Sequence, residues 1–330
     1  MNIRENIALA PHTYMKVGGP ARFFVEVKTE KELQKAVAWA WDKNIPIAVL
    51  GMGSNVLVAD KGFDGLVIHI CCSELLCNGE YIYAGAGVPM AQVSIFSLKN
   101  NFSGFEWAAG IPGTIGGSVY GNAGCFGGEM KDVVECVRVL RITNHELGIM
   151  KNEIIELNTN ECDFGYRESV FKKQKNFIIF GATLKLWHIL DEEKKEKQAW
   201  MQHMMRERVA EQAIGERTMG STFKGISLTH ELISLMKQHD ARFQKPDTAC
   251  WVFENRKGMI SAGFLIEQAG LKEKKIGGVS ISKKHANFLV NDGTATADHV
   301  VMIIAFIKEC VHRKFGVLLE EEIQYMGFEK

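Results

Sequence analysis

The chain of 330 residues has no excess of charge of either sign, because 39 Lys and Arg residues balance 39 Asp and Glu residues. Nothing in this balance favours a nucleic acid or an anionic membrane as the partner. The sequence also lacks an apolar run close to the roughly 20 residues that span a bilayer, and its first residues lack the apolar core of a signal peptide. We therefore expect a cytoplasmic protein. As separate expectations, we take it to be a monomer whose partner is a small molecule.

Paired metal ligands are also missing. The eight cysteines form no C-x-x-C pair and no Cys/His pair at ligand spacing, so we predict no metal site and no disulfide in a reducing compartment. A single histidine such as His285 is more often a packing or hydrogen-bonding residue than a ligand or an acid–base group. We therefore leave His285 out of the catalytic set.

Several regular elements can be predicted. The length exceeds what one core usually serves, so two or three domains are expected. Thr29 and Glu32 form a capping box at the start of a helix that lies between strand-like residues 21–27 and 45–50. A second helix is predicted from Thr296 to Phe315, with Gly316 as its C-terminal cap.

Three short β-branched stretches, residues 132–142, 148–157 and 177–187, predict a mostly antiparallel sheet. The composition changes after Leu190, where a charged, glycine-free segment favours a helix. We therefore place a domain boundary near residue 190.

The segment from Gly104 to Glu129 is dense in glycine, with nine of them in a single run of the chain. A second glycine-rich turn, Gly51 to Asn55, lacks the third glycine and the following helix of a dinucleotide fingerprint, which argues against a Rossmann fold. Dense glycine indicates either a coil filled by its own side chains or a surface where a ligand lies against bare backbone. Neutral N–H groups on such a surface can hold a diphosphate without basic residues.

Seven segments in order resemble the UDP-N-acetylenolpyruvoylglucosamine reductases, also called UDP-N-acetylmuramate dehydrogenases. They are "HTYMKVGGPARFFVEV", "LGMGSNVLV", "GFEWAAGIPGTIGGSVYGNAG", "FGYRESVF", "GSTFK", "IGGVSISKKHANFLVN" and "EEEIQYMG", and they cover nearly the whole chain. The resemblance implies an α+β flavoprotein of the vanillyl-alcohol oxidase type. Two α+β subdomains, residues 1–66 and 67–190, would clasp FAD, and an α/β domain, residues 191–330, would bind substrate and return its C-terminal segment to the active site.

The resemblance also implies a reaction, in which NADPH reduces FAD and FAD reduces UDP-N-acetylglucosamine enolpyruvate to UDP-N-acetylmuramate for peptidoglycan synthesis. The glycine-rich segments would wrap the cofactor. The implied FAD-binding residues are Gly51, Gly53, Ser54, Asn55, Gly110, Ile111, Pro112, Gly113, Gly116, Gly117, Asn122 and Gly124.

Three motif residues would carry the chemistry. Arg167 would stabilise the enolate-like intermediate, since a guanidinium can hold a carboxylate at two oxygens. Ser221 would donate the proton, and Glu322 would polarise the intermediate or relay a proton. Taken alone, each residue type has an ordinary structural interpretation as a surface ion pair, a turn residue or a solvated glutamate. The resemblance favours the catalytic interpretation.

Lys224, Gln268 and Arg206 are the expected substrate-binding residues. The chain departs from the family pattern where Gly225 and Ile226 replace Asn-Pro and where Gln324 replaces an arginine. Arg206 and Arg208 are candidates for the missing positive charge. These departures keep two alternatives open: an FAD-dependent oxidoreductase of the same fold acting on a different substrate, and a flavin-binding protein without activity. The retained catalytic residues argue against the second.

Overall fold

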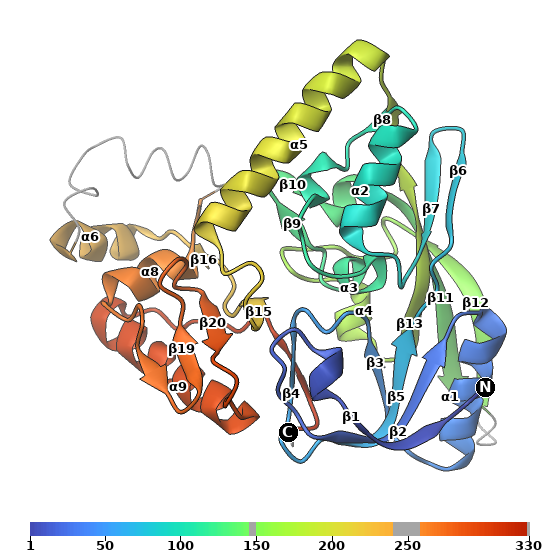
Figure 1. The fold of residues 1–330 in the computed structure, drawn as a ribbon, viewed down its shortest axis with the longest axis horizontal. Coiled ribbons are helices and arrows are strands. Elements are labelled where there is room, and N and C mark those ends of the chain that lie inside the picture. The colour runs from blue at the N-terminus through green and yellow to red at the C-terminus, as the bar shows by residue number, and fades with distance from the viewer. Residues whose placement is uncertain (145–149, 240–257, 329–330) are drawn as a thin grey trace. The chain divides into compact units, whose positions relative to one another are not determined.

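A computed structural model describes residues 1–144, 150–239 and 258–328. The chain forms two compact units that each combine non-contiguous segments (Figure 1). The first unit contains Met1–Ala8, Pro20–Gly53 and Gly62–Val209, and the second contains Leu9–Gly19, Ser54–Lys61 and Ala210–Lys330. Both units mix helices with largely antiparallel sheets, which confirms the α+β class.

The first unit begins with a four-stranded sheet in the order β1-β2-β5-β3. These strands are β1 (Arg4–Ala8), β2 (Pro20–Val27), β5 (Phe63–Ile70) and β3 (Ile47–Leu50). β1 is antiparallel to β2, whereas β2 and β3 both run parallel to β5. Helix α1 (Glu30–Asp42) connects β2 to β3, and the predicted capping box of Thr29 and Glu32 is present at its start.

A second, five-stranded antiparallel sheet in the same unit has the order β12-β11-β13-β7-β6. Its strands are β12 (Met150–Asn158), β11 (Val134–Asn144), β13 (Phe177–Lys185), β7 (Tyr81–Gly85) and β6 (Leu75–Asn78). The long strands β11 and β13 lie side by side in Figure 1. The predicted antiparallel sheet is therefore confirmed, and two strands from the preceding segment extend it. Positions 148 and 149, with which the second predicted stretch begins, lie outside the described residues.

The rest of the first unit consists of loops with short helices and two-stranded ribbons. They are α2 (Met90–Lys99), α3 (Ile115–Tyr120), α4 (Val170–Lys173), β8 (Phe102–Ser103) with β14 (Trp187–His188), and β9 (Gly124–Cys125) with β10 (Gly128–Glu129). The long helix α5 (Asp191–Glu211) follows. Its Met201 is buried with Leu98 of α2 and with Ala109 and Ile189, so α5 packs against α2 and two loop positions of the same unit.

The second unit has a four-stranded antiparallel sheet in the order β15-β20-β19-β18. Its elements are β15 (Thr218–Ser221), β20 (Phe288–Asn291), β19 (Val279–Ile281), β18 (Lys275–Ile276), the ribbon of β16 (Ile226–Ser227) and β17 (Met259–Ile260), and helices α6 (His230–His239), α8 (Ala262–Gln268) and α9 (Ala297–Phe315). Helix α9 confirms the predicted C-terminal helix: Thr296 caps its start and Gly316, at φ 66°, ends it. One apolar face of α9 is buried, and it is formed by Val300, Ile303, Ile304, Ile307 and Val311.

Two segments from the N-terminal half are built into this second unit. Strand β4 (Val56–Val58) pairs in parallel with β21 (Gln324–Met326). The Asp60 carboxylate accepts hydrogen bonds from the backbone N–H groups of Ala297 and Asp298, at 2.9 and 3.1 Å, and so satisfies the start of α9. None of the helices in the described ranges is long and apolar enough to cross a membrane.

Candidate active site

The glycine-rich run of the first unit folds into short elements around α3. Its apolar members fill the core: Trp107, Ile115 and Val119 are buried, and the Trp107 Nε1–H donates to the Gly104 carbonyl at 3.1 Å. The glycines of the run differ in how closely other atoms pack around them. A Cβ on Gly116 would lie 2.8 Å from the Ala86 Cβ, whereas a Cβ on Gly117 would first meet a neighbouring side chain at 3.8 Å. Close packing therefore explains Gly116, whereas the ligand-binding interpretation of Gly117 stays a prediction.

Residues 110–117 of the run contain six of the positions predicted to hold FAD. Pro112 and Gly117 are exposed, and Gly110 and Gly113 have φ values of 74° and 138°, which side chains rarely adopt. A Cβ on Gly117 would meet no neighbouring atom closer than the Thr114 hydroxyl at 3.8 Å, whereas a Cβ on Gly110 would lie 3.3 Å from Arg208 Cδ. This arrangement fits the close approach of a cofactor to backbone, so these residues fit FAD.

Asn122 is fully buried and uses its side chain inside the protein. Its Nδ2 donates to the Gly165 carbonyl and to Glu129 Oε2, both at 2.8 Å, and its Oδ1 accepts from the Lys131 N–H at 3.0 Å. The amide therefore ties the glycine-rich run to the segment that carries Arg167. Asn122 positions this surface, and its predicted role toward FAD itself stays a prediction.

Arg167 follows Gly165, the residue that Asn122 contacts, by two positions in the first unit. Its Nη2 donates to the Gly124 carbonyl at 3.1 Å, and its guanidinium lies 5.4 Å from the Tyr166 ring centroid. Its backbone has φ 57°, an unusual conformation for a residue other than glycine. Such strain is found at functional sites, where surrounding structure holds it in place.

The second unit brings the other two predicted catalytic residues together. Thr222, which follows Ser221, accepts the Glu322 N–H at its carbonyl at 2.8 Å, and the Lys224 N–H donates to the Glu320 carbonyl at 2.9 Å. An antiparallel bridge joins Phe223 to Glu321 between these two bonds. Backbone pairing therefore sets the "GSTFK" and "EEEI" segments side by side.

The turn at Ser54 and Asn55 joins the same cluster. Asn55 Nδ2 donates to the Glu322 carbonyl at 3.2 Å, and the Asn55 carbonyl accepts the Gln324 N–H at 2.9 Å. A Cβ on Gly220 would lie 3.8 Å from the Ser54 carbonyl oxygen. Three segments that are far apart in the sequence thus meet at Ser221 and Glu322.

Two lysines form ion pairs with the glutamates that precede Glu322. Lys224 Nζ lies 3.3 Å from Glu320, and Lys308 Nζ lies 3.0 Å from Glu321. These two carboxylates therefore form ion pairs within the second unit, and the catalytic role of Glu322 stays a prediction. Glu322 and Ser221 are both partly buried.

The remaining substrate-binding candidates lie on helices. Gln268 ends α8, and its carbonyl accepts a hydrogen bond from Lys314 Nζ at 2.5 Å. Arg206 is exposed on α5, where its Nε donates to the Gln202 carbonyl at 3.3 Å. Nothing in these contacts tests their roles, which stay predictions.

Arg208, which sequence reasoning ranked behind Arg206, is the buried arginine of α5. It follows the buried Met201 by seven positions, so both lie on one face of the helix. That spacing was the available signal in a helix that is otherwise charged on all sides.

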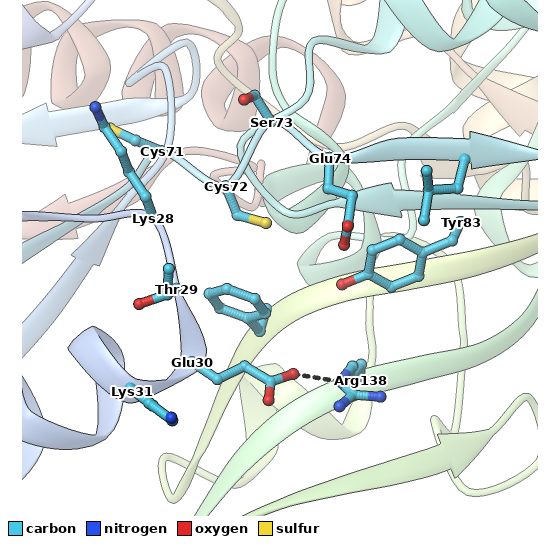
Figure 2. Close-up of a pocket in the computed structure, with 12 residues that line it drawn as sticks. Lys28, Thr29, Glu30, Lys31, Cys71, Cys72, Ser73, Glu74, Tyr83 and Arg138 are labelled. Carbon is cyan, nitrogen blue, oxygen red and sulfur yellow. Dashed lines mark hydrogen bonds and ion pairs between the residues drawn. The ribbon is translucent and has the colours of Figure 1, made fainter.

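The first unit also contains an open pocket of about 960 Å³ that none of the predicted site residues lines. Figure 2 shows it between the start of α1, residues 71–74 and the sheet residues Tyr83 and Arg138, with the Glu30–Arg138 ion pair at its base. Burial raises the pKa of the Tyr83 phenol and of the Cys72 thiol, so both stay protonated near neutral pH. Neither of these two groups is therefore an activated nucleophile.

Comparison with known proteins identifies two matching regions. Residues 21–146 match the FAD binding domain family, and residues 212–326 match the C-terminal domain of UDP-N-acetylenolpyruvoylglucosamine reductase. An FAD-binding domain joined to a reductase domain defines an FAD-dependent oxidoreductase.

Relatives match along the full length. A UDP-N-acetylenolpyruvoylglucosamine reductase of a Synechococcus species is 35% identical over 98% of this chain and 91% of its own, and one of Listeria monocytogenes is 35% identical over 99% and 96%. The crystal structure of the Thermus caldophilus reductase matches with a TM-score of 0.72 and 29% identity, covering 98% of this chain and all of that one. The chain belongs to the UDP-N-acetylenolpyruvoylglucosamine reductase family, which confirms the resemblance.

Proposed function

We propose that the protein uses NADPH and FAD to reduce UDP-N-acetylglucosamine enolpyruvate to UDP-N-acetylmuramate, a precursor of peptidoglycan. The observation that carries this proposal is the backbone pairing of Thr222 with Glu322, which brings Ser221 and Glu322 into one cluster. Family membership supplies the substrate class, since the relatives are named for this reduction.

The first unit is proposed to hold FAD. Its two sheets would be the two FAD-clasping subdomains, and the accessible backbone of Gly110–Gly113 and Gly117 would lie against the cofactor. FAD, when bound, supplies a carrier that accepts hydride from NADPH and delivers it to the enolpyruvyl double bond. Backbone N–H groups of this surface would hold its diphosphate through their fixed dipoles.

The protein's own residues handle charge and protons. Hydride addition at the terminal carbon of the enolpyruvyl group pushes electrons onto the neighbouring carbon and its carboxylate, which a fixed cation stabilises. Arg167 is proposed as that cation, because its hydrogen bond to Gly124 fixes the guanidinium. Ser221 would then protonate the neighbouring carbon, with Glu322 and Lys224 tuning the hydroxyl.

The departures from the family pattern have a partial structural account. Gln324, which stands where the family has arginine, donates through its N–H to the Asn55 carbonyl and through Nε2 to the Glu322 carbonyl at 3.2 Å. Gln324 therefore helps to hold the cluster together. Gly225, in place of an asparagine, removes a polar side chain next to Lys224, which is the observation favouring the alternative of a different substrate for the same chemistry.

The absorbance spectrum of the purified protein tests both candidates. A flavin envelope is expected, which NADPH should bleach and UDP-N-acetylglucosamine enolpyruvate should restore under anaerobic conditions. Bleaching without recovery on this substrate would favour the alternative. A protein that binds no flavin, even when FAD is added, would contradict both.

A further inference from the structure

Arg208 is a buried cation whose binding edge meets no acceptor from the described protein. Only 5% of the residue is exposed, and among the residues that the structure describes neither Nε nor Nη2 has a hydrogen-bond partner. A buried guanidinium is costly unless its N–H groups meet acceptors. The Nε and Nη2 groups of Arg208 therefore require a hydrogen-bond acceptor from outside the described residues.

The two unpartnered atoms identify the shape of that acceptor. Nε–H and the N–H of Nη2 point to the same side of the guanidinium, and this edge binds two oxygens of one phosphate or carboxylate at once. One face of the group is covered by the Phe126 ring, whose centroid lies 4.9 Å from Cζ. The ring holds the group in place, and the edge stays available.

The position of Arg208 favours a phosphate over a carboxylate as the acceptor. A Cβ on Gly110 would lie 3.3 Å from Arg208 Cδ and 3.5 Å from Nε, so the unpartnered edge lies next to the backbone of the predicted FAD surface. Backbone of this kind binds phosphate oxygens. None of the ion pairs in the described ranges involves Arg208, whose Nε and Nη2 atoms are buried without a hydrogen-bond partner there.

We infer that Arg208 binds a phosphate group of a nucleotide at two oxygens, beside Gly110. This inference rests on the proposed function, which brings three such nucleotides to the protein: FAD, NADPH and the UDP-linked substrate. It assigns to Arg208 the positive charge that the sequence placed first on Arg206. It also gives Phe126 the role of positioning residue.

Dissociation constants test the inference separately from activity. FAD is removed and its rebinding followed by flavin fluorescence, and UDP and NADP⁺ are titrated calorimetrically into FAD-loaded protein. Arg208→Gln should raise the Kd of one of the three ligands about 10- to 100-fold, as expected for losing two charge-assisted hydrogen bonds. The affected ligand identifies the source of the phosphate.

Lys195→Gln is the matched control, because it removes one positive charge from an exposed site on α5. It should leave all three Kd values unchanged. If Arg208→Gln does not fold, Arg208→Lys replaces it, since it keeps the charge and most of the stem but cannot hold two oxygens. Three Kd values within about twofold of the wild type, in a variant with an unchanged melting curve, would overturn the inference. A failure of the proposed function would appear instead in the wild type, as no turnover of the enolpyruvyl substrate.

Discussion

Arg167 donates a hydrogen bond from Nη2 to the Gly124 carbonyl at 3.1 Å, so the predicted electrostatic catalyst is attached to the glycine-rich run. The buried Asn122 ties the same two segments together through Gly165. Any movement of the run would therefore move the arginine with it. The positive φ of Arg167 costs about 1–3 kcal/mol, a cost that surrounding contacts must offset.

Replacing Arg167 by lysine should separate charge from geometry. Lysine bears the same backbone cost at φ 57° and keeps the charge, but it lacks the planar fork. We expect the oxidation of reduced FAD by substrate to slow about 10²-fold or more, with little change in FAD reduction by NADPH. Stopped-flow absorbance of both half-reactions measures this. Equal slowing of the two would point to a general role in holding the cofactor.

Two adjacent glycines give a paired test of the cofactor surface. Gly117→Val should fold and lose most of its flavin, because the new side chain meets open space in the protein but would occupy room needed by FAD. Gly116→Ala should instead lower Tm, because its Cβ would lie 2.8 Å from the Ala86 Cβ and 3.1 Å from the Ala86 carbonyl oxygen. Flavin content per folded molecule and Tm are the measurements. Full flavin occupancy in Gly117→Val would remove the cofactor interpretation of this glycine.

Ser221 should matter for protonation and little for stability. Ser221→Ala should leave FAD reduction by NADPH almost unchanged but lower turnover at least ~10²-fold, with Ser221→Cys retaining more because a thiol can still donate. Single-turnover reoxidation of reduced FAD by the enolpyruvyl substrate decides this. A near wild-type rate in Ser221→Ala would exclude the proton-donor role.

The stability of the second unit should depend on pH through His285. Burial lowers the pKa of His285, whose Nδ1 accepts the Asn287 N–H at 3.2 Å. Because the folded pKa lies below the unfolded value of about 6.5, the unfolded chain binds more protons, and stability falls as pH drops below about 6.5. His285→Asn, which keeps a short acceptor, should show a weaker fall in Tm between pH 7 and pH 5. Parallel Tm curves would show that another group dominates.

Local patterns predicted α1 and α9, whereas α2 and α6 were not predicted. The ends of α1 and α9 are set by capping residues that lie next to them in the sequence, so the sequence alone reveals the ends. The capping residues are Thr29 and Glu32 in α1, and Thr296 and Gly316 in α9. The pairing of β4 with β21 could not be predicted in this way. Val56–Val58 has the composition of a strand, but its partner Gln324–Met326 lies near the opposite end of the chain, where no local signal points back to it.

In the candidate site too, the sequence reveals local motifs but not the contacts between distant segments. The residues of the motifs were named from the resemblance, but only the fold shows that Asn55, Thr222 and Glu322 share hydrogen bonds. The choice between Arg206 and Arg208 depended on which face of α5 is buried. A helix with charges on every side gives little information about that choice until Met201 is known to be in the core.

The residues that complete the second unit have a consequence for protein synthesis. Strand β4 and the Asp60 cap are translated long before Ala210, yet their partners are β21 and α9. On a ribosome these early segments must wait unpaired until the last helix emerges. A fragment that starts at residue 210 would lack the neighbour of its own C-terminal strand, so the matched C-terminal region should be insoluble when expressed alone and recovered when residues 9–19 and 54–61 are supplied.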